Sequence, residues 1–400
     1  MNELQLVPRY HALDGVRAFA MLLGVFLHSS IPYIQVPFFW PIVDDSRSVG
    51  LTLVIFVIHT FRMPAFFLIA GFFARLVFHR IGMRAFVRRR AKRVLLPFVV
   101  GWLLLYPLVR FLGVWSAVRA FPGAELWPVV KLAFAPPFLG FGMGLIHLWF
   151  LYYLALLYLF GLTGRWLLFR NSEGGNRRRE RVCALFESLM RSRFAVLGLA
   201  LPTACGLMLM RGWGVDFVDR SIFPRVAHLV FFGLFFVSGW LLHRNPNLLS
   251  VLRARWLMHI IIGTLMLWPE IAFLHLVYVV KHDSGLGFRF AYFLIYAVIA
   301  WCFVLGLIGI FQRFFDNPSR AWRYLADASY WIYLAHLPLV IALPVFLREL
   351  AASWHVKLAV VLAASIPLLV GSYHLLVRYT WIGAFLNGRR MPTTRPDARA

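Results

Sequence analysis

The chain has 400 residues, of which 61% are apolar and 14% are charged, and its 41 Lys and Arg against 16 Asp and Glu give a net charge of +25. Soluble domains carry about a quarter charged residues, so this composition excludes a soluble enzyme, a secreted disulfide scaffold and a DNA-binding domain. Apolar runs close to the ~20 residues that cross a bilayer recur along the whole chain. The sequence therefore predicts a membrane protein with no nucleic-acid partner.

We expect an all-α polytopic membrane protein with about ten transmembrane helices. The first apolar run lacks a small-residue cleavage site and is expected to stay as a span. The second is long enough to require tilt, a break or an extension beyond the bilayer, and Pro64 is the expected kink. The proline-rich segment 123–141 is expected to be interfacial or re-entrant. The apolar runs between charged breaks place the spans at 13–34, 49–78, 94–113, 145–163, 194–210, 226–242, 256–279, 288–311, 324–346 and 356–378.

Basic residues are distributed unequally between the two sides of this predicted bundle. Counted from a cytoplasmic N-terminus, 27 Lys and Arg fall on the cytoplasmic side and ten on the other. Because basic loops stay in the cytoplasm, we expect both termini there. We treat residues 1–400 as one membrane domain, with a core at about 10–380, a basic cytoplasmic loop at 164–193 that is expected to be flexible at 171–181, and a flexible tail at 387–400.

The first predicted span carries the densest set of ionisable residues, Asp14, Arg17 and His28. Arg17 and His28 are eleven residues apart, about three helical turns, so they lie on one helix face. Asp14 can form an i,i+3 ion pair with Arg17. His28 falls in the outer half of the membrane, where a neutral imidazole can act as general base for a hydroxyl arriving from outside. The alternative is a histidine that only hydrogen-bonds to a neighbouring helix.

Other ionisable residues inside predicted spans are candidates for a substrate pocket. The second span places His59 and Arg62 on adjacent turns, and Arg62 near the midplane requires a carboxylate, a bound anion or carbonyl groups as partner. The remaining candidates are His147, Glu270 and His336. The three cysteines are too far apart in the sequence for a disulfide framework or a metal motif, so we expect no metal site.

A basic cluster without acidic residues, RAFVRRRAKR at 84–93, directly precedes the third predicted span. The positive-inside rule and contact with lipid headgroups explain such a cluster by charge alone. The alternative is a clamp for phosphates that enter a cavity from the cytoplasm, since Arg binds phosphate through two hydrogen bonds.

Five motifs stand out in the chain: LDGVRA from 13, the Arg17-x10-His28 spacing, FFLIAGFF from 66, the Arg90 and Arg93 pair before Pro97, and ASYWIYLAHLPL from 328. Taken together, these features resemble the acyltransferase 3 family of integral membrane acyltransferases over about residues 10–380. Within that family, the segments HTFRMPAFF from 59, IHLWFLYYL from 146 and YLAHLP from 333 look most like the members that succinylate osmoregulated periplasmic glucans.

The resemblance implies a ten-helix core in the bacterial inner membrane. It implies transfer of an acyl group from cytoplasmic acyl-CoA, here succinyl-CoA, to a hydroxyl of a periplasmic glycan, with membrane lipid around the helices and no bound cofactor. By motif match, catalysis is assigned to His28 with Arg17 as its partner and Asp14 beside it. The CoA phosphates are assigned to the basic residues Arg89, Arg90 and Arg93.

Arg62 is expected to bind the carboxylate at the end of a succinyl group, because a buried Arg can supply the opposite charge. The family assigns no role to His59, Glu270 or His336 in this sequence. His336 also lacks the second, adjacent histidine that we expect in the closest relatives.

Three alternatives compete with this prediction. The first is a member of the same family that transfers acetyl groups to lipopolysaccharide, peptidoglycan or an exopolysaccharide. The second is a transporter or flippase for a lipid-linked or anionic solute, against which the absence of an internal repeat counts. The third is an unrelated acyltransferase built around a His with an Asn or Asp, but no Asn accompanies the histidines inside the predicted spans.

Overall fold

The computed structural model describes residues 9–35, 40, 42–119, 125, 127–128, 130–131, 144–168, 173–213, 215, 223–280 and 285–387. Within these ranges the chain is helical, and its one β feature is an isolated bridge between Ile34 and Ser48. The all-α prediction is confirmed. The helices are α1 (His11–Ser30), α2 (Val49–Arg90), α3 (Leu96–Arg119), α5 (Trp149–Leu168), α6 (Glu173–Arg191), α7 (Ala195–Leu207), α8 (Val226–Leu242), α9 (Leu248–Tyr278), α10 (Leu286–Phe314), α11 (Arg320–Leu347), α12 (Trp354–Ser372) and α13 (Trp381–Asn387).

Seven helical stretches in the described residues are long and apolar enough to cross a membrane. The longest, Val49–Ser116, contains both α2 and most of α3, and therefore covers two of the predicted spans. The shorter helices α7 and α8 are also apolar and coincide with the predicted spans 194–210 and 226–242. The chain is thus a polytopic membrane protein, while the count of ten spans and the cytoplasmic position of the termini stay predictions.

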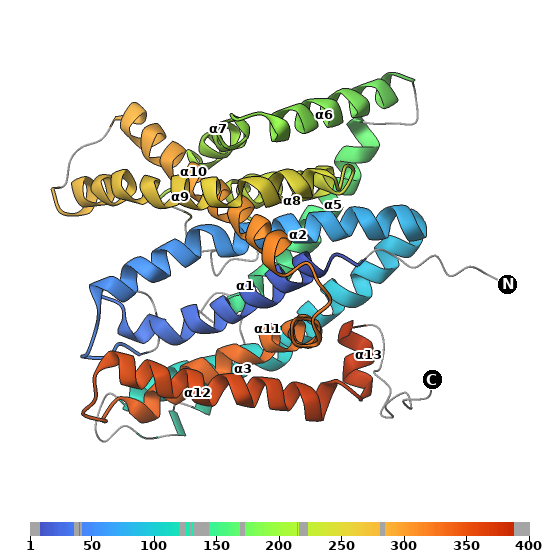
Figure 1. Ribbon diagram of the computed structural model, residues 1–400. Helices are drawn as coiled ribbons and strands as arrows, with labels where there is room; N and C mark the ends of the chain where they lie inside the picture. The colour runs from blue at the N-terminus through green and yellow to red at the C-terminus, as the bar shows by residue number, and fades with distance from the viewer. Residues whose placement is uncertain are drawn as a thin grey trace.

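Helix α1 lies in the middle of the bundle, where it packs against α2, α10, α11 and α12 (Figure 1). On one side of α1, α10 packs along α9 and α7, and on the other side α11 packs against α3 and α12. The buried residues of α1 are mostly small or aliphatic, which permits this close surrounding by neighbours. Polar side chains on the remaining face of α1 are therefore placed in the interior of the protein.

Helix α2 is longer than predicted and its backbone breaks at a different residue. The helix continues past the predicted end at residue 78 to Arg90, while its extension beyond the bilayer stays a prediction. Non-helical backbone angles within α2 occur at Gly82, where φ is 74° and ψ is 172°, a conformation that glycine adopts without steric cost. Helical angles continue across Pro64, so the backbone break lies at Gly82, and the kink at Pro64 stays a prediction. A π-helical turn, Ala91–Leu95, then leads into α3.

Helices α2 and α8 cross at two glycines. A side chain at Gly71 would collide with the backbone of Phe236, and a side chain at Gly239 would collide with the backbone of Leu68. Since helices in lipid associate through close packing of small residues, these glycines allow the two backbones to approach. The crossing holds the part of α2 that follows Arg62 firmly within the bundle.

The segment that we expected to be a basic cytoplasmic loop contains a helix. Helix α6 has the spacing of an amphipathic helix and buries Phe186 and Met190. The guanidinium of Arg255, on α9, donates hydrogen bonds to the carbonyl groups of residues 190, 191 and 192 at the end of α6. The last carbonyls of a helix have no partner within it, so Arg255 stabilises this end. The loop prediction is wrong for Glu173–Arg191, whereas residues 388–400 of the predicted tail and most of 123–141 lie outside the described residues.

The connection between α1 and α2 is fastened to α12. The carboxylate of Asp44 accepts a 2.8 Å hydrogen bond from Lys357 Nζ, and both side chains are buried. The hydroxyl of Ser46 accepts a 2.9 Å hydrogen bond from the backbone N–H of Trp354. These contacts fix the end of α1 that carries His28.

Candidate functional site

A cavity of about 650 Å³ is lined by residues from α1, α2, α5 and α11. At one end its lining includes half-exposed arginines, Arg9 and Arg378, and at the other end it includes the buried residues Arg62, His147 and His336. The half-exposed end lies near α13 and the start of α1, on the right in Figure 1. The exposure of the lining therefore falls from this end of the cavity toward the histidines.

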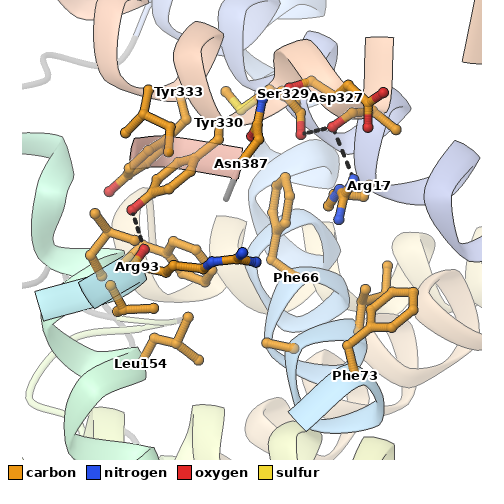
Figure 2. Close-up of a pocket in the computed structure, with 18 of the residues that line it drawn as sticks. Arg17, Phe66, Phe73, Arg93, Leu154, Asp327, Ser329, Tyr330, Tyr333 and Asn387 are labelled. Atoms are coloured by element: carbon orange, nitrogen blue, oxygen red, sulfur yellow. Dashed lines mark hydrogen bonds between the residues drawn. The ribbon is translucent and has the colours of Figure 1, made fainter. Parts of the chain in front are cut away.

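Figure 2 shows the wall formed by α1 and α11 near this half-exposed end. Arg17 Nη2 donates a 2.9 Å hydrogen bond to the carbonyl of Ala326 on α11. Asp14 pairs with Arg17 at 3.3 Å and with Arg9 at 2.9 Å, so the predicted i,i+3 pair is confirmed. About three helical turns separate Arg17 from His28, and the structure does not bring the two side chains into contact. Arg17 therefore lines the half-exposed end of the cavity and has its polar contacts with Asp14 and α11.

The basic residues Arg89, Arg90 and Arg93 line the same cavity. The guanidinium of Arg90 lies 5.0 Å from the ring centroids of both Phe86 and Tyr158, a cation–π arrangement that orients it. The hydroxyl of Tyr330 donates to the carbonyl of Arg93 at 2.7 Å (Figure 2). The ion pairs found between described residues include none of these three arginines. Their charges are available to an anion in the cavity.

Three histidines from separate parts of the chain meet at the buried end. His28 Nδ1 lies 2.8 Å from His336 Nε2, and the two rings are nearly parallel, with 6° between their planes and centroids 5.1 Å apart. His147 packs with its ring nearly perpendicular to that of His336, also at 5.1 Å. His336 Nδ1 lies 3.0 Å from the carbonyl oxygen of Ile332 and 2.8 Å from that of Tyr333. Among the described residues, no group of three His, Cys, Asp or Glu side chains is arranged to hold a metal ion.

A strained backbone residue precedes His147. Ile146 has a φ of 44°, in a region that β-branched residues rarely adopt. The hydroxyl of Tyr333 donates a 2.8 Å hydrogen bond to the carbonyl of His147 and so holds this turn against α11. Backbone strain of this kind is concentrated at functional sites, and here it places the His147 side chain in the lining of the cavity.

Arg62 lies beside the histidines with 7% of its surface exposed. Gly24 of α1 makes room for it, because a side chain at Gly24 would collide with the guanidinium. The charge of Arg62 acts electrostatically on both His28 and His336. No carboxylate pairs with Arg62 among the ion pairs of the described residues. A bound anion is therefore the partner that its position favours.

Two of the predicted pocket residues are not in the cavity lining. Glu270 is fully buried on α9, next to Tyr292 of α10. His59 lies one turn before Arg62 on α2 and is also absent from the cavity lining, but it is close enough to His28 to act on it electrostatically. Glu270 therefore lies outside the site around His28, whereas His59 adjoins it.

Sequence reasoning missed three contributors to this site. Tyr333 and Ser329 line the cavity, and their spacing of three and seven residues before His336 could have placed them on its helix face. Trp40, whose ring stacks on His28 with centroids 5.9 Å apart, lies in an irregular connection. No periodic pattern marks it in the sequence.

Comparisons with known proteins indicate the family of this chain. The sequence profile of the acyltransferase 3 family, described as an acyltransferase domain, matches residues 10–374. The chain is 26% identical to glucans biosynthesis protein C of Salmonella paratyphi B over 336 residues, which are 84% of this chain and 83% of the relative. The protein of the same name from Salmonella agona is 26% identical over 335 residues, with the same coverage. No solved structure matches the chain.

Proposed function

Since the chain belongs to the acyltransferase 3 family, we propose that it transfers an acyl group from cytoplasmic acyl-CoA to a hydroxyl group of a periplasmic glycan. The observation that carries this proposal is the shared cavity, whose lining includes Arg89, Arg90 and Arg93, which form no ion pair among the described residues, together with His28 and Arg62. The arginines can bind the phosphate groups of the donor, and His28 can remove the proton of an acceptor hydroxyl. The chain functions as a single domain of the bacterial inner membrane in this proposal.

The donor binds with its phosphates at Arg89, Arg90 and Arg93, and its thioester extends along the cavity toward His28. His28 removes the proton from the acceptor hydroxyl, whose oxygen attacks the thioester carbonyl, or it forms a short-lived acyl-histidine. The alkyl side chains exposed on the outer helices contact membrane lipid. Asp14 and Arg17 hold the wall between α1 and α11 at the half-exposed end of the cavity.

We propose succinyl as the acyl group and an osmoregulated glucan as the acceptor. The names of the relatives support a glucan. The position of Arg62 supports succinyl, because the buried guanidinium lies in the same cavity as His28 and can pair with the second carboxylate of the donor. An acetyl donor would leave this charge unpaired.

The test is mass spectrometry of envelope glycans from cells that carry the wild-type or the His28→Ala protein. We expect His28→Ala to abolish acylation while the amount of protein in the membrane is unchanged. His355→Ala, at an exposed histidine outside the cavity, should leave acylation intact. Normal acylation in the His28 variant would overturn the proposal.

The mass added per sugar identifies the acyl group. In a parallel assay, purified protein is incubated with acyl-CoA and glucan, and release of the free CoA thiol is followed. Thiol release that depends on His28 supports an enzyme, and its absence in the wild type would favour a transporter.

A further inference from the structure

A chain of hydrogen bonds through His336 determines which ring nitrogen of His28 is available for chemistry. His336 is 1% exposed, and its Nδ1 faces two backbone carbonyl oxygens of its own helix, those of Ile332 and Tyr333. A carbonyl oxygen only accepts hydrogen bonds, so Nδ1 of His336 must carry the proton. In the neutral ring, Nε2 of His336 is then the unprotonated acceptor.

The protonation state of His336 in turn determines which ring nitrogen of His28 carries the proton. His28 Nδ1 lies 2.8 Å from His336 Nε2, and two unprotonated nitrogens at that distance would repel one another. Nδ1 of His28 therefore donates its proton to His336 Nε2, which leaves the lone pair of His28 on Nε2. Resting on the proposed function, we propose that His336 is a positioning residue that holds His28 in its Nδ1–H form, with Nε2 as the reacting nitrogen.

The alternative arrangement has a doubly protonated His336 that donates to His28. The groups that face the pair disfavour it. Arg62 from α2 places a positive charge beside both rings, and His147 and Tyr333 supply no negative charge. A second cation in this buried place would be repelled by the first. The neutral pair with the shared proton on His28 Nδ1 is the arrangement that the site favours.

With His28 in its Nδ1–H form, every bond and proton of the acyl-transfer step is accounted for. The O–H bond of the acceptor breaks and its proton moves to His28 Nε2, while the oxygen forms a bond to the thioester carbonyl carbon. The C–S bond then breaks, and the departing thiolate takes the proton back from Nε2. Throughout, His28 Nδ1–H remains bonded to His336, so the ring cannot rotate or exchange tautomers between the two proton transfers.

A pair of variants at residue 336 separates positioning from packing. The amide oxygen of His336→Gln can accept the proton of His28 Nδ1, whereas His336→Leu offers no acceptor. We expect His336→Leu to lower kcat by about 100-fold with the KM for acyl-CoA nearly unchanged, and His336→Gln to recover most of that loss. Both variants must insert into the membrane like the wild type. Equal activity of the Leu and Gln variants would overturn the proposal.

The tautomer itself can be measured without turnover. Solid-state NMR of protein labelled with ¹⁵N in its histidine rings, compared with a His28→Asn variant to assign the signals, should show a protonated Nδ1 and an unprotonated Nε2 for His28. In His336→Leu the His28 signals should change to the Nε2–H form. A wild-type His28 already in that form would contradict the proposal even if acyl transfer is normal. If acyl transfer is absent in the wild type but the NMR result holds, the proposed function fails and the positioning role of His336 stands.

Discussion

The carboxylate of Asp44 and the ammonium group of Lys357 form an ion pair at 2.8 Å, with 3% and 5% of their side chains exposed. The two residues are 313 positions apart in the sequence. Lys357 also donates to the carbonyl of Arg348 at 3.2 Å, so its ammonium group has protein partners in place of water. The pair joins the connection after α1 to the first turn of α12.

Breaking this pair from one side should be costly. Asp44→Asn leaves Lys357 buried without its counter-charge, and loss of one partner from such a pair costs about 3–5 kcal/mol. We expect a correspondingly lower thermal stability in detergent, measured by the unfolding of purified protein. Glu187→Gln provides the control, since its ion pair with Arg191 is exposed and should contribute little to the stability of the protein. Equal losses of thermal stability in the two variants would show that the buried pair stabilises the protein no more than the exposed pair does.

Gly24→Ala should reduce activity without reducing stability. The added methyl group collides with the guanidinium of Arg62, so Arg62 must move away from the histidines, and we expect kcat to fall by about tenfold or more. Alanine also favours the helix by about 1 kcal/mol over glycine, so the unfolding temperature should not fall. Gly371→Ala, on α12 with no atom within 4 Å of the new methyl group, should be active and stable. A Gly24→Ala protein with full activity would contradict this account of Arg62.

Donor selectivity tests the role proposed for Arg62. If the guanidinium pairs with the free carboxylate of a succinyl group, Arg62→Leu should lower kcat/KM for succinyl-CoA by about 100-fold. The value for acetyl-CoA, which has no second carboxylate, should change much less. Arg62→Lys keeps the charge and should retain part of the preference. If the ratio of kcat/KM for succinyl-CoA to kcat/KM for acetyl-CoA is unchanged in Arg62→Leu, Arg62 does not bind the succinyl carboxylate.

The end of α6 should depend on Arg255. Its guanidinium donates to the carbonyls of residues 190, 191 and 192, and hydrogen bonds from a charged donor are worth about 1.5–3 kcal/mol each. Arg255→Gln should therefore increase hydrogen exchange at the end of α6 several-fold, as measured by mass spectrometry. Arg253→Gln, at an exposed position two residues earlier, should leave exchange at α6 unchanged. Faster exchange in both variants would indicate a general effect of charge on α9.

Some features of the site were accessible from the sequence because they depend on neighbours along the chain. The Asp14 and Arg17 pair follows from i,i+3 spacing, and the basic cluster from 84 to 93 follows from composition. Other features of the structure could not be predicted from the sequence. The break in α2 occurs at Gly82 and not at Pro64, because a proline can remain within a helix when its surroundings compensate, whereas the backbone at Gly82 has a positive φ. The segment 173–191 was predicted to be a loop because it carries many charges. The four-residue spacing of Phe186 and Met190, which form part of the buried face of α6, was the signal for a helix.

By itself the sequence determined that this protein is an all-helical membrane protein with ionisable residues at particular positions within its apolar spans. It could do so because hydropathy and helical period are local properties of the chain. It also placed His28 and Arg17 on one face of one helix. Only the tertiary structure decided which partner each received. Arg17 bonds to α11 near the half-exposed end of the cavity, while His28 meets His336, 308 residues away. Such a contact depends on how α1 and α11 pack against each other, and no spacing along a single helix encodes it.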